Sequence, residues 1–122
     1  MIRPVLFVNK MDRYLRELKY DAETMYQKLC QVIDTVNIVI SQYDVPEMVD
    51  ETMGSPGNAP SLLCEPDKGN VAFGSGFEQW GFTITNFARK YAVASGVSLE
   101  DMTKMLWGDW FYNKKKKSFT TE

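Results

Sequence analysis

The sequence predicts an α/β fold in which helices connect parallel strands. Two short runs, Val5–Val8 and Val71–Phe73, are apolar on both faces, which is typical of buried parallel strands. Between them, residues 25–43 carry apolar side chains at spacings of three and four, which indicates a helix with one apolar face. This order of elements favours parallel strands, because parallel neighbours need a long crossover connection.

The first half of the chain is expected to contain one long helix and one long loop. Asp21 is suited to be the N-cap of the helix. The apolar stripe of the helix consists of Met25, Leu29, Val32, Ile33, Val36, Ile40 and Tyr43. Residues 44–69 contain four prolines and three glycines, which break any period. We therefore expect a long surface loop there, with at most a short strand near Leu62-Leu63.

Two further helices are expected after the second strand. Thr83 is suited to cap a helix that ends at Gly96. Ser98 and Asp101 have the spacing of a weak capping box, which would open a shorter helix that stops at Gly108.

The C-terminal segment is expected to form two strands around a turn of lysines. Residues 110–112 and 118–120 are rich in aromatic or β-branched side chains, and Lys114–Lys117 lie between them. Four adjacent cations attract phosphate and other anions, so contact with an anionic partner is one interpretation, and a solvated hairpin turn is the other.

Composition excludes several classes of function. The chain has 122 residues, 44% hydrophobic and 25% charged, with a net charge of −2, as expected for one modest globular unit. It contains no histidine, which excludes His-based catalysis and His-containing zinc sites. Cys30 and Cys64 lack metal-ligand spacing, so we expect a reducing, cytoplasmic environment. No apolar run approaches the roughly 18 residues that span a bilayer, so no membrane span is expected. The small net charge creates no global field that favours nucleic acid or a membrane surface, so neither DNA nor a membrane is expected as a partner.

A polar motif, Asn9-Lys10-Met11-Asp12, directly follows the first buried strand. Ligands of open α/β sheets bind beyond the carboxyl ends of strands. A carboxylate only accepts hydrogen bonds, so Asp12 can accept from guanine N1–H and the 2-amino group, whereas adenine offers neither donor there. Asn9 can reach guanine N7 and tie neighbouring loops, and Lys10 can lay its stem over the base. In the alternative interpretation, Asp12 merely caps the next helix.

A second candidate segment for contacting the base follows the other buried strand. It is the run Phe73-Gly74-Ser75-Gly76-Phe77. Its two glycines allow the backbone to approach a ligand closely. We expect the N–H of Gly76 to donate to guanine O6, where adenine carries an amino group. We expect Ser75 to hold the turn, with a hydrogen bond to Asp12 as one means.

Three separated blocks resemble the eukaryotic elongation factor 2 family, the ribosomal translocase GTPases. They are RPVLFVNKMDRYLRELKYDAETMYQKLCQVIDTVNIVIS, GNVAFGSGFEQWGFTITNFARKYA and DMTKMLWGDWFYNKKKKSFT, in the order that the family has them. The resemblance covers nearly the whole chain apart from residues 44–69. One departure is Phe77-Glu78-Gln79 before Trp80, where the family often has Leu-His-Gly.

The resemblance implies a partial P-loop GTPase-type parallel sheet with flanking helices, followed by the start of an inserted α+β subdomain. Residues 1–76 would be the C-terminal half of the GTPase core and residues 77–122 the beginning of the insert. Asn9, Lys10, Met11 and Asp12 would recognise the base, together with a second turn formed by Ser75, Gly76 and Phe77. The implied ligands are GTP and GDP, and the implied partners are the ribosome and its RNA.

The sequence lacks the motifs that handle phosphates. It contains neither G-x-x-x-x-G-K-[ST] nor D-x-x-G, so nothing in it is expected to cradle the β- and γ-phosphates or to sense the γ-phosphate. We therefore expect a fragment of a larger enzyme that hydrolyses no GTP alone, with Mg²⁺ bound only by the full-length protein. The alternatives are a non-catalytic interaction module, or a spliceosomal or ribosome-assembly relative of the same GTPases.

Overall fold

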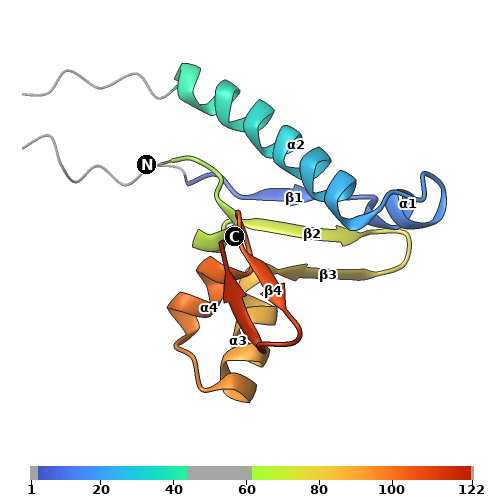
Figure 1. The fold of residues 1–122 in the computed structure, drawn as a ribbon. Coiled ribbons are helices and arrows are strands. Elements are labelled where there is room, and N and C mark those ends of the chain that lie inside the picture. Colours follow the sequence, from blue (N-terminus) through green and yellow to red (C-terminus); the bar gives the residue numbers. More distant parts are fainter. Residues whose placement is uncertain (1–2, 44–61, 122) are drawn as a thin grey trace, which may run out of the picture.

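The computed structural model describes residues 3–43 and 62–121, which form a mixed α/β structure (Figure 1). In chain order, the elements of the first part are β1 (Leu6–Val8), α1 (Met11–Arg16), α2 (Ala22–Tyr43) and the 3₁₀ turn η1 (Pro66–Lys68). The elements of the second part are β2 (Val71–Ser75), β3 (Trp80–Thr83), α3 (Ile84–Ser95), α4 (Leu99–Met105), β4 (Phe111–Asn113) and β5 (Ser118–Thr120). Within these residues, no helix is both long and apolar enough to cross a membrane.

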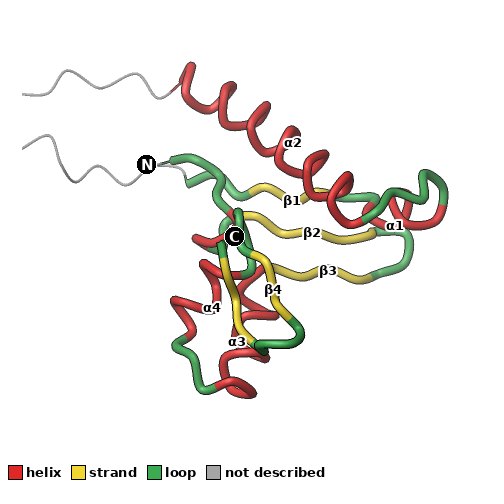
Figure 2. The backbone as a smooth tube through the Cα atoms, viewed as in Figure 1, coloured by secondary structure: helices red, strands yellow, loops and turns green. Residues whose placement is uncertain are grey.

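The central sheet has three strands in the order β1-β2-β3 (Figure 2). β1 and β2 are parallel, with Leu6 opposite Val71 and Val8 opposite Phe73, as the strand–helix–strand order predicted. β3 is antiparallel to β2 and was not predicted. The sheet is therefore mixed rather than purely parallel, because the four residues after Ser75 turn the chain straight back along β2.

Helix α2 covers one face of this sheet and creates the main core. It begins after Asp21, whose carboxylate accepts a hydrogen bond from Thr24 N at 3.2 Å, so the predicted cap is confirmed. Leu29 and Ile33 are buried against the sheet, while Tyr43 at the end of the predicted stripe is 82% exposed. The sheet contributes Val8, Val71 and Phe73 to this core.

The opposite face of the sheet is open among the described residues. Phe7 points to this face and is 52% exposed, so the prediction that β1 is buried on both faces is wrong. Its ring lies over Gly74 and Gly81, which are opposite each other on β2 and β3. An added Cβ at Gly74 would lie 2.4 Å from the carbonyl oxygen of Trp80 and 2.9 Å from Phe7 Cζ, which explains the glycine.

The chain before β2 is held to α2 by one side chain. Asn37 donates from Nδ2 to the carbonyl oxygen of Cys64 at 2.9 Å and accepts from Cys64 N at 2.8 Å. Leu62 and Leu63 form no strand, which agrees with the expected loop. The rest of the expected loop, residues 44–61, lies outside the described residues.

The last third of the chain consists of α3, α4 and the hairpin β4–β5. Thr83 and Asn86 form a capping box at the start of α3, and Gly96 ends the helix with φ +72°, as predicted. Ser98 caps α4 by accepting from Asp101 N at 3.1 Å. That helix ends at Met105 rather than at Gly108, since Leu106 and Trp107 leave the helix to pack against the core.

The hairpin begins one residue later than predicted and otherwise matches the prediction, with Tyr112 opposite Phe119 and all four lysines of the turn exposed.

The predicted division between residues 76 and 77 falls in the turn between β2 and β3, which pair in one sheet. The division into two regions stays a prediction.

We predict that Gly74→Ala lowers the free energy of unfolding by about 1–3 kcal/mol, because the new methyl group meets backbone atoms that cannot move independently. Urea unfolding followed by circular dichroism measures the loss. Gly76→Ala is the matched control: its Cβ would meet only the Asn9 side chain, at 3.5 Å, so we expect a change within about 0.5 kcal/mol. Equal losses in the two variants would contradict this account of Gly74.

Candidate functional site

The ends of β1 and β2 are joined by the side chain of Asn9. Its Oδ1 accepts a hydrogen bond from Lys10 N at 2.7 Å and another from Gly76 N at 2.8 Å. Lys10 has φ +64°, a left-handed conformation that turns the chain abruptly from β1 into α1. The tie between neighbouring loops that the sequence predicted for Asn9 is confirmed.

The turn between β2 and β3, residues 76–79, is also held at its other end. Ser75 Oγ accepts from Glu78 N at 3.1 Å, and the carboxylate of Glu78 accepts from Trp80 Nε1 at 3.0 Å. The same carboxylate forms an ion pair with Arg16 at the end of α1, with 2.6 Å between Nη1 and Oε1. This turn and α1 therefore lie together at one end of the sheet (Figure 1).

Between α1 and this turn is a shallow hollow of about 380 Å³, which we call the base hollow. Its volume lies within the usual range for small-molecule sites. Its lining residues are Asn9, Lys10, Asp12, Arg13, Glu17, Gly76 and Phe77. Five of the seven residues that the sequence assigned to nucleotide recognition thus line one hollow, although the two groups are more than sixty positions apart in the chain.

Met11 and Ser75, the other two assigned residues, do not line the base hollow. Met11 is 2% exposed and packs into the core below α1, and Ser75 is 1% exposed. Ser75 holds the turn as predicted, through its bond to Glu78 N. Within the described residues it makes no hydrogen bond to Asp12, so that expected contact is not present.

The N–H of Gly76 is already engaged, because it donates to Asn9 Oδ1. The prediction that this N–H donates to guanine O6 does not hold in this geometry. The reason is that Asn9 is close enough to satisfy it within the protein. The next N–H along the chain, that of Phe77, has no hydrogen-bond partner within residues 3–43 and 62–121, and the Phe77 side chain is 89% exposed.

Asp12 is partly buried in the first turn of α1. The alternative interpretation, in which this carboxylate caps the helix, is not supported, since the N-cap is Lys10 and no side chain caps the helix. Within the described residues the Asp12 carboxylate has no hydrogen-bond or ion-pair partner. It is therefore a free acceptor at the edge of the base hollow.

Charged residues complete the rim of the base hollow. Arg13 and Glu17 form an ion pair, with 2.8 Å between Nε and Oε2, and both are more than half exposed. An exposed pair of this kind contributes little to stability. The pair of Arg16 with Glu78 was missed by the sequence analysis, because nothing in the sequence relates two residues that meet only when α1 packs beside the turn.

The side chains of Tyr26, Cys30 and Cys64, which lie outside the base hollow, have shifted pKa values. Burial raises the pKa of the Cys30 thiol and that of the Cys64 thiol, so neither is an activated nucleophile. Burial, and then a hydrogen bond with Cys30, raises the pKa of Tyr26 to about 12. No cluster of three or more metal-ligating side chains occurs in the described part of the chain.

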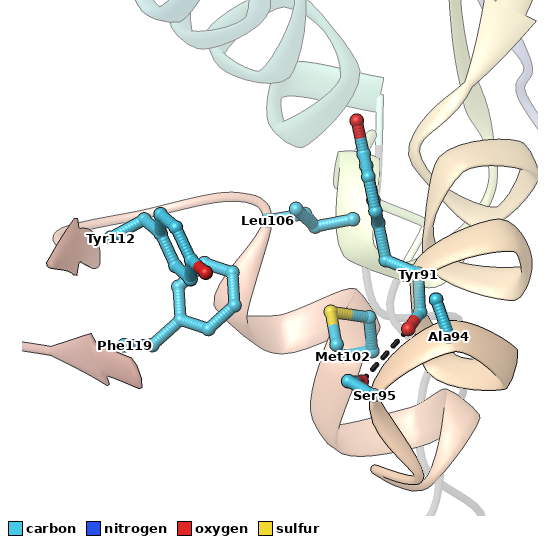
Figure 3. A pocket seen from close by; sticks show the side chains of 7 residues that line it. All are labelled: Tyr91, Ala94, Ser95, Met102, Leu106, Tyr112 and Phe119. Atoms are coloured by element: carbon cyan, nitrogen blue, oxygen red, sulfur yellow. Dashed lines mark hydrogen bonds between the residues drawn. The ribbon is translucent and has the colours of Figure 1, made fainter. Parts of the chain in front are cut away.

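A larger hollow of about 550 Å³ lies between α3, α4 and the hairpin (Figure 3). It is lined mainly by apolar groups: Tyr91, Ala94, Ser95, Met102, Leu106, Tyr112 and Phe119. Tyr112 and Phe119 face each other across the hairpin, with 5.2 Å between ring centroids. It carries no carboxylate, amine or thiol, so it offers contact surface rather than chemistry.

Comparison of the chain with models of known protein families finds no match. The functional assignment therefore depends on the residues and geometry of the base hollow.

We predict that Asn9→Ala speeds hydrogen exchange of the Gly76 amide by about five- to thirtyfold. The variant removes the only acceptor of that N–H in the described structure, and one such bond contributes about 1–2 kcal/mol. Exchange measured by NMR tests this. Asn113→Ala is the control: it removes an Oδ1 that accepts from Lys115 N and Lys116 N in the hairpin, so the Gly76 rate should not change. An unchanged Gly76 rate in Asn9→Ala would show that another group protects this amide.

Proposed function

We propose that this chain is the guanine-base-recognising part of a translational GTPase of the ribosomal translocase type. The observation that carries the proposal is the convergence of Asn9, Asp12, Gly76 and Phe77 on the base hollow. These residues come from the ends of two parallel strands, the usual location of ligands in open α/β sheets. Their residue types match the donors and acceptors of guanine.

Asp12 would supply selectivity between purines. Its unpartnered carboxylate can accept from N1–H and from the 2-amino group of guanine. Adenine presents an acceptor and a C–H at these positions, which would leave the carboxylate desolvated and unpaired. Such a loss costs on the order of a few kcal/mol, enough for about a hundredfold preference.

The opposite edge of the base would face Asn9 and the turn. Because Asn9 Oδ1 already accepts two backbone hydrogen bonds, its Nδ2 group is the part left to donate to guanine N7. The N–H of Phe77 is the nearest unengaged backbone donor in the chain after Gly76, and it replaces Gly76 as the proposed donor to O6. Lys10 would lay its methylene stem across the base.

The remainder of the nucleotide has no assigned partner in this chain. Phosphoryl transfer depends on groups that neutralise the phosphates, and the sequence contains no motif for them. We therefore assign base recognition of GTP or GDP to these residues and derive no hydrolytic step. Mg²⁺, the ribosome and its RNA, and a cytoplasmic location belong to the same proposal through the resemblance to translational GTPases.

A non-catalytic interaction module remains the alternative function. The observation that favours it is the C-terminal hairpin, where Trp110, Phe111 and Tyr112 are 39–57% exposed beside Lys114–Lys117. Under this alternative the base hollow would bind no nucleotide. A spliceosomal or ribosome-assembly GTPase is the related variant of the first proposal, and it predicts the same base chemistry.

The test is an NMR titration of the ¹⁵N-labelled chain with GMP, AMP and XMP. We expect weak binding of GMP, with shifts confined to the amides of the base hollow, and no comparable shifts with AMP. Asp12→Asn should lose GMP binding and gain XMP binding. The side-chain amide of the introduced asparagine can donate to the 2-oxo group of xanthine, a group that guanine replaces with an amino group. The loss for GMP should be at least tenfold, since one charge-assisted pair of hydrogen bonds is removed.

Asp34→Asn is the matched control, since Asp34 is exposed on α2 and does not line the base hollow. It should bind GMP as the unaltered chain does. Equal shifts with GMP and AMP, or an unchanged base preference in Asp12→Asn, would remove Asp12 from the assigned role. The absence of shifts in the base hollow with all three nucleotides would support the interaction module.

We further predict that the purified chain releases no phosphate from GTP above the rate of a buffer blank, because it lacks a phosphate-binding motif. A phosphate-release assay with Mg²⁺ measures this. Turnover that persists through purification and that falls in Asp12→Asn would contradict the prediction.

A further inference from the structure

The geometry points to Glu78 as a positioning residue for base selectivity, an inference that rests on the proposed function. We propose that the ion pair of Glu78 with Arg16 sets the separation between the Asp12 carboxylate and the Phe77 N–H. This ion pair would thereby determine whether Asp12 and the Phe77 N–H can hydrogen-bond to opposite edges of the same guanine.

Glu78 is built into the turn by three contacts. Its N–H donates to Ser75 Oγ at 3.1 Å, and its carboxylate accepts from Trp80 Nε1 at 3.0 Å. The other carboxylate oxygen lies 2.6 Å from Arg16 Nη1. The Glu78 side chain is 21% exposed and the Arg16 side chain 73%, so the carboxylate end of this ion pair is shielded from water and the guanidinium end is not. The orientation of the carboxylate is therefore defined from both sides.

Arg16 transmits this contact to the base hollow through helix α1. Asp12 and Arg16 are four residues apart, so they lie on the same side of the helix, about one turn apart. The ion pair between Arg16 and Glu78 therefore limits the rotation of α1 about its own axis. That rotation decides whether the Asp12 carboxylate faces the turn.

The turn is attached at two points, and Phe77 lies between them. Asn9 holds Gly76 at the start of the turn, and Arg16 holds Glu78 two residues later. Phe77 itself makes no hydrogen bond within the described residues, and its position is set by its neighbours on each side. Loss of the second attachment would leave its N–H free to move relative to Asp12. Discrimination by paired hydrogen bonds is sensitive to such displacement.

The experiment is a double-mutant cycle on base affinity, with GMP and IMP as probes. IMP lacks the 2-amino group, so the ratio of GMP affinity to IMP affinity reports on Asp12. We expect Glu78→Gln and Arg16→Gln each to lower GMP affinity about three- to tenfold and to reduce the GMP-to-IMP ratio. The double variant should lose no more than either single variant, because both remove the same pair. Arg16→Lys should restore most of the affinity, since it keeps the charge.

Glu78→Gln also keeps an acceptor for Trp80 Nε1, so the turn itself should stay folded. Glu100→Gln is the matched control. It breaks an ion pair of 2.9 Å with Lys104 on α4 and does not line the base hollow. Its GMP affinity should equal that of the unaltered chain, and its thermal unfolding midpoint should match that of Glu78→Gln within a few degrees. A readout without ligand is the Phe77 amide signal, which should shift in Arg16→Gln and return in Arg16→Lys.

The outcomes separate this inference from the proposed function. If the unaltered chain does not prefer GMP over AMP, the proposed function and the role of Glu78 both fall. If it does, but Glu78→Gln binds GMP with an unchanged GMP-to-IMP ratio, base recognition stands and the role of Glu78 falls. Additive losses in the double variant would likewise overturn it, because they would mean that Glu78 and Arg16 act separately.

Discussion

One side-chain oxygen organises the candidate site. Asn9 Oδ1 accepts from the backbone of its own loop and from the backbone of the turn after β2. A single acceptor with two lone pairs thereby joins segments that are 67 residues apart. The arrangement is possible because parallel β1 and β2 end at the same edge of the sheet, with Val8 opposite Phe73. This junction and the Arg16–Glu78 ion pair together hold the β2–β3 turn beside α1.

The hydrophobic core holds the residues around this junction in place. Val8 precedes the motif Asn9-Lys10-Met11-Asp12, Met11 lies within it, and both are buried with Phe73 under α2. Met11 illustrates this division of roles, because its neighbours line the base hollow while its own side chain fills the core. A motif of four residues thus contains three exposed or partly exposed polar groups and one hydrophobic anchor. This explains how a short helix of six residues can hold Asp12 in a defined position.

The base hollow and the larger hollow between α3, α4 and the hairpin differ in chemistry. The base hollow has carboxylates, cations, an amide and a free backbone donor at its rim, whereas the larger hollow near the hairpin is lined by aromatic and aliphatic groups (Figure 3). Polar groups that converge on a small volume can discriminate between ligands of the same shape, while apolar walls mainly supply affinity. For this reason the smaller hollow carries the functional proposal.

The sequence by itself determined most of the helices and strands and most of the residues that line the base hollow. Apolar runs predicted β1 and β2, Asp21, Thr83 and Ser98 marked the starts of three helices, and residue chemistry selected Asn9 and Asp12. These features are local, so periodicity and capping reveal them. Tertiary structure decided the rest: the antiparallel β3, the open face at Phe7, the capture of the Gly76 N–H by Asn9, and the pairing of Arg16 with Glu78. Each of these depends on which segments become neighbours, and no local pattern encodes a contact between residues that only folding brings together.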